Sequence, residues 1–228
     1  MVPTPPVGSP TLLLFPTQLE RERFADQGGL PTGLALDELC GFGPIAAAAR
    51  ASQLLARLQP ARVVLIGIAG SYDPERLPIG TAWEFSGVAL HGVGVGEGRE
   101  FRGPPALGFP QWPAAEPAEH VEDRIALRHG EGAECDAGLL LTTCAASDSL
   151  EQAALRRSGF PDAVAEDMEG FGVALACSLE RTPLRIVRGI SNRVGDRDPS
   201  SWRIPAALAA ARRTVRDILA DPAWGRGE

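Results

Sequence analysis

Acidic and amide side chains gather in the last third of the sequence, beside apolar segments. Glu166, Asp167 and Glu169 stand between an apolar run and a helix of small residues, and Asn192 follows an apolar strand expected over residues 184–190. A helix that connects two parallel strands brings their carboxyl ends to one edge of the sheet, where ligands of open α/β sheets bind. The spacing predicts that Glu169 and Asn192 face one small molecule, with their two strands adjacent.

The composition is that of a globular enzyme. The 228 residues are 44% hydrophobic and 22% charged, and this length suits one domain with a large core. The net charge of −7 argues against nucleic-acid binding, and no apolar run reaches the roughly 20 residues of a membrane span. Residues 1–10 contain four prolines and are expected to form a disordered tail rather than a secretion signal. We therefore expect a cytoplasmic domain over residues 11–228.

Cysteines and histidines do not have the spacing of metal ligands. The four cysteines include no CxxC pair and are expected to be reduced thiols. The three histidines lie far apart in the sequence, so we expect no zinc or iron site and no cofactor.

Apolar runs alternate with helical patterns, which predicts a single α/β domain with a central mixed sheet flanked by helices. Strands are expected over residues 11–15, 62–70, 79–85, 137–143, 163–166 and 184–190. Helices are expected after Thr17, over 45–58, after Asp148, over 168–179 and from Asp198 to about 219. Residues 91–119 are rich in Gly and Pro, as in a binding loop or lid, and residues 117–134 are expected to be partly helical.

Glu20 has two interpretations that the sequence leaves open. Thr17 and Glu20 have the spacing of a capping box, in which the carboxylate only caps the following helix. Glu20 also follows the first expected strand closely, so its carboxylate could instead point into the ligand crevice.

Several stretches together resemble the nucleoside phosphorylase and nucleosidase superfamily. Ala165-Glu-Asp-Met-Glu-Gly-Phe-Gly-Val-Ala is similar to its Met-Glu motif, and Arg188-Gly-Ile-Ser-Asn192 to its Arg-x-Ile-Ser-Asp/Asn strand. Ile66-Gly-Ile-Ala-Gly70 resembles its Gly-Ser-Ala-Gly strand end, and the resemblance covers about residues 11–220. Residues 190–198, followed by Trp202, resemble the futalosine hydrolases. That subfamily removes hypoxanthine from a nucleoside with a carboxyphenyl ketone arm, in menaquinone biosynthesis.

The resemblance implies roles in the cleavage of an N-ribosidic bond. Glu169 would accept hydrogen bonds from the ribose 2′ and 3′ hydroxyls, and Glu20 would activate water. Asn192 would contact the purine at N7 and O6, which favours hypoxanthine or guanine because relatives that cleave 6-aminopurines carry Asp there. Further substrate contacts are implied for Met168, Ala69, Gly70, Ala145, Ala146, Ser147 and Asp167, with residues 145–147 using their backbone to bind the base.

Water is the expected nucleophile. The phosphorylases of the superfamily carry Arg and Ser where this chain has Leu65 and Ile68, and a phosphate without a cation would be costly to bury. A purine nucleoside phosphorylase and a methylthioadenosine/adenosylhomocysteine nucleosidase remain alternatives, as does a nucleoside-binding protein without enzymatic activity. The resemblance further implies a homo-oligomer, a dimer or larger. An arginine such as Arg99 or Arg102 is a candidate partner for a substrate carboxylate.

Overall fold

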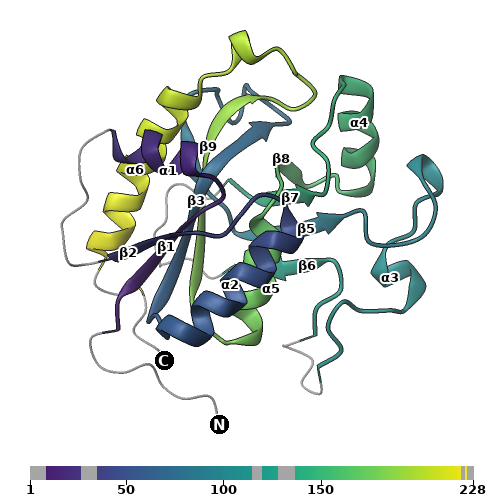
Figure 1. Ribbon diagram of the computed structural model, residues 1–228. Coiled ribbons are helices and arrows are strands. Elements are labelled where there is room, and N and C mark those ends of the chain that lie inside the picture. The colour runs from purple at the N-terminus through teal and green to yellow at the C-terminus, as the bar shows by residue number, and fades with distance from the viewer. Residues whose placement is uncertain (1–8, 27–34, 115–119, 128–136, 222–223, 225–228) are drawn as a thin grey trace.

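One mixed sheet forms the centre of the molecule (Figure 1). The computed structural model describes residues 9–26, 35–114, 120–127, 137–221 and 224, so most of the expected tail lies outside the described residues. The strands are β1 Thr11–Phe15, β2 Ala35–Leu39, β3 Arg62–Ser71, β4 Ala82–Glu84, β5 Gly87–His91, β6 Arg124–Ala126, β7 Leu139–Thr143, β8 Ala163–Asp167 and β9 Leu184–Arg193. Their order is β2-β1-β3-β8-β7-β5-β6, while β9 pairs with both β3 and β4.

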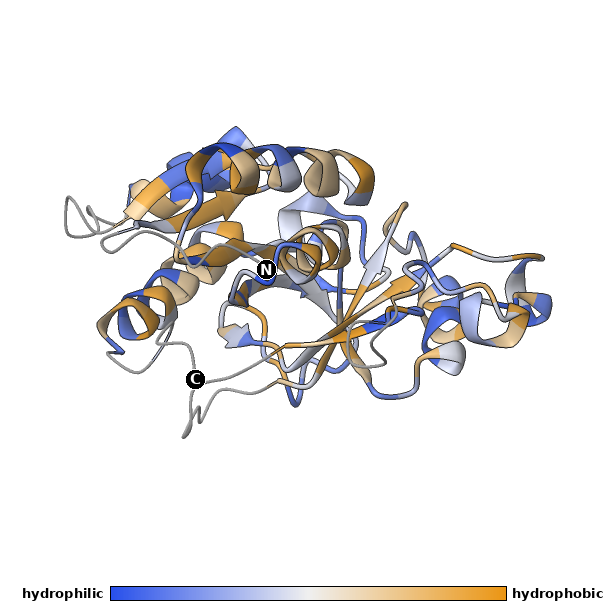
Figure 2. Cartoon of the chain, turned by 90° about the horizontal axis from the view of Figure 1, so that it is seen from below, coloured by the Kyte–Doolittle hydropathy of each residue, from blue (hydrophilic) through white to orange (hydrophobic). Residues whose placement is uncertain are grey.

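Helices cover both faces of this sheet. They are α1 Gln18–Ala25, α2 Pro44–Leu58, α3 Pro104–Leu107, α4 Leu150–Gly159, α5 Gly170–Leu179 and α6 Ile204–Ala220, with short 3₁₀ turns η1 Gly98–Glu100 and η3 Pro199–Ser201. Helices α2 and α5 share one apolar core with the sheet, and α1 and α6 share another. In Figure 2, orange apolar residues run along the central strands. The order of the layers is therefore helix, sheet, helix.

Alternation along the strands divides the side chains between these two cores. In β1, Leu12 and Leu14 belong to the core under α2 and α5, and Leu13 and Phe15 to the core under α1 and α6. Successive strand residues point to opposite faces of a sheet, so a continuous apolar run is what a strand buried on both faces requires. The mixed α/β domain expected from the sequence is confirmed.

Most of the expected elements are confirmed, and several boundaries are wrong. Strands β2, β5 and β6 were not expected, and β6 lies in the stretch 117–134 that was expected to be partly helical. Residues 117–119 and 128–134 of that stretch lie outside the described residues. Ser149, not Asp148, caps α4, because its side chain accepts a hydrogen bond from the Gln152 N–H. Asp198 caps only the turn η3, and α6 begins later, at Ile204.

The expected adjacency of β8 and β9 is wrong, because β3 lies between them. Strand β9 runs parallel to β3 along one edge, and β8 pairs antiparallel with the end of β3 at the other edge. The register of β3 against β9 shifts between Ala69 and Gly70. All three strands nevertheless bring their carboxyl ends to one place.

No helix in the described ranges is long and apolar enough to cross a membrane. Nor do three or more His, Cys, Asp or Glu side chains in those ranges gather in a way that could hold a metal ion.

Candidate active site

A cavity of about 340 Å³ opens where β3, β8 and β9 end. It brings together Glu20, Glu169 and Asn192, which come from three separate parts of the chain. The other residues expected to bind substrate also lie on its wall, except Ala145: Ala69, Gly70, Ala146, Ser147, Asp167 and Met168. Ala145 is exposed and does not line the cavity, so its expected contact with the base is not supported.

Glu20 points from the first turn of α1 toward the end of β3. Its Oε1 accepts a hydrogen bond from the Ile68 N–H at 3.0 Å, and its Oε2 accepts one from Thr17 Oγ1 at 2.6 Å. Thr17 caps the helix as expected, because Oγ1 accepts the Glu20 N–H. Half of a capping box therefore forms, and the carboxylate faces the cavity instead of completing the box.

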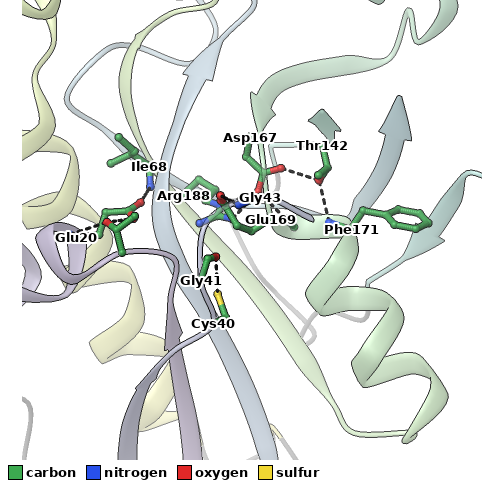
Figure 3. A network of polar contacts seen from close by, with 12 residues as sticks. Glu20, Cys40, Gly41, Gly43, Ile68, Thr142, Asp167, Glu169, Phe171 and Arg188 are labelled. Carbon is green, nitrogen blue, oxygen red and sulfur yellow. Dashed lines mark hydrogen bonds and ion pairs between the residues drawn. The ribbon is translucent and has the colours of Figure 1, made fainter. Parts of the chain in front are cut away.

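Arg188, on β9, lies at the centre of the polar network (Figure 3). Its side chain is fully buried and donates to Asp167 Oδ2 from Nη2 at 2.5 Å and from Nε at 3.0 Å. Nη2 also lies 3.4 Å from Glu169 Oε2. Burial acts to lower the pKa of Arg188, but the charges of Asp167, Glu169 and Glu20 outweigh it and raise that pKa. Arg188 therefore stays cationic among carboxylates.

Arg188 and Glu20 both contact the backbone of Gly67 on β3. A Cβ at residue 67 would lie 2.1 Å from Arg188 Nη1 and 2.8 Å from Glu20 Oε1. Within the described part of the chain, Nη1 is buried and has no hydrogen-bond partner. Glycine is thus required here by close approach, because Arg188 Nη1 and Glu20 Oε1 both pack against its backbone.

Asp167 reaches the cavity wall, but its carboxylate does not face a ligand. The side chain is fully buried, and it accepts hydrogen bonds from Thr142 Oγ1 at 2.6 Å and the Gly170 N–H at 2.8 Å, in addition to Arg188. The substrate contact expected for Asp167 stays a prediction, because Asp167 lines the cavity while its carboxylate is engaged by these three partners. Its carboxylate fixes the position of Arg188.

Glu169 precedes the first turn of α5 but does not cap that helix with its side chain. Its Oε1 accepts a hydrogen bond from the Gly43 N–H at the start of α2, at 3.1 Å. Burial raises the pKa of Glu169 to about 7, with Asp167 adding to the rise and Arg188 opposing it. The carboxylate thus changes its charge near neutral pH.

Asn192 is held by its neighbours in a fixed orientation. Its Oδ1 accepts from Ser191 Oγ at 2.7 Å, and its Nδ2 donates to the Arg193 carbonyl at 2.8 Å. Nδ2 also donates to the Asp196 carbonyl at 3.5 Å, so Oδ1 keeps a second acceptor position while a base that accepts from Nδ2 would replace one of these two carbonyls. Asn192 lines the cavity.

Comparison with known proteins identifies the family of the chain. The family model of the Phosphorylase superfamily matches residues 32–221. The chain belongs to this superfamily. Futalosine hydrolase of Streptomyces coelicolor is 37% identical over 153 residues, which cover 67% of this chain and 63% of that protein. Futalosine hydrolase of Thermus thermophilus is 32% identical over 94% of this chain and 97% of that protein.

Solved structures confirm the phosphorylase-superfamily fold. The 5′-methylthioadenosine/S-adenosylhomocysteine nucleosidase of Neisseria meningitidis, in complex with methylthio-immucillin-A, superposes with a TM-score of 0.73. It is 20% identical, and the match covers 93% of this chain and 100% of that one. Glu20 precedes the range matched by the family model, so its place in the site rests on the geometry described above.

Three expectations about the cavity wall need correction. Ser147 lines the cavity, but its backbone N–H donates to Glu166 at 2.7 Å and so is not free for a base. Arg99 and Arg102 do not line the cavity; Arg197 does, with its guanidinium 5.0 Å from the Trp202 ring centroid. No described residue of the loop over 91–114 lines it either, so that loop is not a lid on this chain's own cavity.

Proposed function

We propose that this chain hydrolyses the N-ribosidic bond of futalosine and releases hypoxanthine. One observation carries the proposal: Glu20, Glu169 and Asn192, distant in sequence, line one cavity with a buried guanidinium beneath it. Cleavage of this bond requires stabilisation of a cationic sugar, recognition of the leaving base and a placed nucleophile. The similarity to two futalosine hydrolases supports the same activity.

Glu169 is the group for the ribose. Each of its oxygens has one partner, Gly43 N–H on Oε1 and Arg188 on Oε2, so each retains acceptor capacity for a sugar hydroxyl. A carboxylate at this position also stabilises positive charge that develops on the sugar. Met168 lines the cavity beside it and packs against the sugar face.

The activity should therefore depend on the ionisation of Glu169. Only the carboxylate form stabilises a cationic sugar, and the pKa of Glu169 is raised to about 7. We expect kcat/KM to fall about tenfold for each pH unit below 7 and to level off above it. Initial rates of base release between pH 5 and 9 measure this. In Glu169→Gln, the residual rate should lose that slope, and an unchanged profile would assign the titration to another group.

Glu20 and Arg188 are the groups for water. Glu20 lines the cavity and would take a proton from a water there, while Arg188 Nη1, which has no hydrogen-bond partner among the described residues, packs beside it against Gly67. A cation therefore lies at the site, although not at the strand position where the phosphorylases of the superfamily carry Arg. Arg188 is, however, surrounded by Asp167, Glu169 and Glu20, so the cluster is negative in sum.

A negative cluster opposes a phosphate dianion. Ile68 adds an apolar wall to the cavity, and Leu65 lies in the core away from it. The negative charge of the cluster and the apolar wall at Ile68 both favour water over phosphate as the nucleophile.

Asn192 contacts the purine base. Arg197 and Trp202 would bind the carboxyphenyl ketone arm of futalosine. The amide suits a 6-oxopurine, which presents N7 and O6 along one edge. A guanidinium stacked on an aromatic ring offers both charge and an apolar face to a carboxyphenyl group. A nucleosidase that acts on 6-aminopurine nucleosides remains the second candidate, because the superposed Neisseria protein is a 5′-methylthioadenosine/S-adenosylhomocysteine nucleosidase.

The setting of this activity is part of the proposal. We place the enzyme in menaquinone biosynthesis in the cytoplasm, with residues 11–228 acting as one domain. We also propose a homo-oligomer, because Phe42 lines the cavity at 66% exposure and Ile45 beside it is 82% exposed. Apolar side chains this exposed at the rim of a site are typical of an interface.

Chromatography of released bases tests the proposal. Purified protein is incubated with futalosine, inosine, guanosine and methylthioadenosine, each with and without phosphate. We expect hypoxanthine from futalosine at the highest kcat/KM, unchanged by phosphate. Faster release of adenine would favour the second candidate, and a strict phosphate requirement would contradict hydrolysis.

A further inference from the structure

Residues 192–203 form a compact loop between β9 and α6 that supplies part of the cavity wall. The Arg203 N–H donates to the Ser191 carbonyl at 2.8 Å, so the two ends of the loop lie side by side. Four loop residues beyond Asn192 line the cavity: Val194, Gly195, Arg197 and Trp202. Compact surface loops with close ends are held together by their own side chains and frequently carry function. The side chains that hold this loop therefore influence the shape of the site.

Asp196 holds the middle of the loop. Its Oδ2 accepts a hydrogen bond from Ser201 Oγ, and its Oδ1 accepts one from the Asp198 N–H at 2.9 Å. These two hydrogen bonds lower the pKa of Asp196, and the bond from Ser201 contributes most. The side chain is therefore ionised at neutral pH. Asp196 does not line the cavity itself.

The hydrogen bond between Asp196 and Ser201 lies next to the pair that is proposed to bind the substrate arm. Arg197 follows Asp196 in the chain, and Trp202 follows Ser201. A single bond between residues 196 and 201 therefore brings the next residue of each together. The Arg197 guanidinium lies 5.0 Å from the Trp202 ring centroid, and both residues line the cavity.

We propose that Asp196 is a positioning residue that sets a preference for nucleosides with an aryl carboxylate arm, by holding Arg197 against Trp202. The guanidinium then meets the carboxylate in a fixed orientation, and the indole ring faces the aryl group. This assignment rests on the proposed function, in which Arg197 and Trp202 bind that arm.

The contact with the purine base does not depend on the Asp196 side chain. Ser191 Oγ and the Arg193 carbonyl hold the amide of Asn192, at 2.7 and 2.8 Å. Asp196 contributes only its backbone carbonyl, at 3.5 Å. A nucleoside without the arm, such as inosine, should therefore be cleaved equally well when the Asp196 side chain is removed.

The ratio of kcat/KM for futalosine to kcat/KM for inosine tests the assignment. In Asp196→Ala we expect this ratio to fall at least about fivefold, the order of one lost hydrogen bond, with the inosine value unchanged. Ser201→Ala should lower the ratio alike, and the double variant should fall no further, because both substitutions break the same contact. An unchanged ratio, or an equal loss for both nucleosides, would overturn the proposal. If Asp196→Ala fails to fold, Ser201→Ala decides.

The sign of the effect separates position from charge. The negative charge of Asp196 beside Arg197 repels a substrate carboxylate, so charge alone would make the ratio rise in Asp196→Ala. In Asp196→Asn, the amide can accept the Asp198 N–H and donate to Ser201 Oγ, and the Ser201 hydroxyl already lies 2.8 Å from the Asp198 carbonyl. This variant should recover most of the lost ratio. A rise in Asp196→Ala, or no recovery in Asp196→Asn, would refute positioning.

Asp198→Asn is the matched control for these variants. Asp198 is an exposed acid of the same loop, and its carboxylate accepts a hydrogen bond only from the Ser200 N–H among the contacts described, at 2.9 Å. Asparagine keeps this acceptor, so the ratio should stay at the parent value. If the control lowers the ratio as much as Asp196→Ala does, the effect is not specific to Asp196 and the assignment fails.

A fragment of the arm separates this assignment from the activity itself. Acetylbenzoate carries an aryl ketone and a carboxylate without a nucleoside, and its dissociation constant is measured by calorimetry. Binding that weakens at least about fivefold in Asp196→Ala, but not in Asp198→Asn, would uphold Asp196 even if no base is released from any nucleoside. Equal binding by the parent and Asp196→Ala, or no binding by the parent, would count against Asp196 while leaving futalosine hydrolysis intact.

Discussion

Glu20→Gln is expected to lower kcat for hypoxanthine release by about 10²–10⁴-fold, the usual contribution of a general base. The glutamine side chain can still accept the Ile68 N–H that Glu20 binds at 3.0 Å, so the fold should be retained. The amide cannot take a proton from water at neutral pH. Single-turnover rates, measured alongside the unfolding midpoint in urea, separate the loss of chemistry from any loss of structure.

Glu22→Gln is the matched control for this substitution. Glu22 lies on the same helix and is exposed, and its carboxylate accepts a hydrogen bond only from Gln18 among the contacts described. The control should keep the parent rate. If Glu20→Gln retains more than about a tenth of the parent kcat, general-base catalysis belongs to another residue and the assignment of Glu20 to the nucleophilic water is refuted.

Arg188→Leu is expected to damage both stability and activity. The substitution leaves the carboxylates of Asp167 and Glu169 buried without their cation, and breaking a buried ion pair from one side costs about 3–5 kcal/mol. It also removes the Nη1 donor beside Glu20, and loss of one such oriented donor costs about 10²–10³ in kcat. Urea unfolding and kcat per folded molecule measure the two effects separately.

Arg185→Leu distinguishes these two effects. Arg185 is equally a buried arginine of β9 and pairs with Glu84 at 3.3 Å, but it does not line or underlie the cavity. We expect it to lower the free energy of unfolding by a similar amount while kcat per folded molecule stays unchanged. If the two variants lose kcat alike, the defect of Arg188→Leu is one of folding.

Strand positions were predictable because strands buried on both faces need unbroken apolar runs. The runs at β1, β3, β7 and β9 all form strands close to the expected limits. Strand β2 was missed because the charged pair Asp37 and Glu38 interrupts its apolar pattern; the strand lies at the sheet edge, where Asp37 is exposed and Glu38 is half-buried. The pairing of β8 with β3 could not be predicted, because it consists of two residue pairs between strands that are about 95 residues apart in the sequence, Gly70 with Glu166 and Ser71 with Ala165.

Glu169 and Asn192 were recognised from motif and spacing, and they do share the cavity. Arg188 received no role, although it belongs to a motif that had been recognised. The sequence did contain a sign of its importance: a charged residue between Val187 and Gly189 in a buried strand must have a buried partner. Which carboxylates neutralise Arg188 depends on the tertiary structure. The tertiary structure also determines that the Asp167 carboxylate binds Arg188.

The position of β3 has a consequence for the protein during its synthesis. One edge of β3 is completed by β1, from the start of the chain, and the other by β9, from near its end. Before β9 has emerged from the ribosome, the nascent chain contains Glu20, Asp167 and Glu169 but cannot yet place Arg188 and Asn192 in the fold. Catalytic competence therefore arrives only with the last strand, and a polypeptide released early would be inert toward nucleosides.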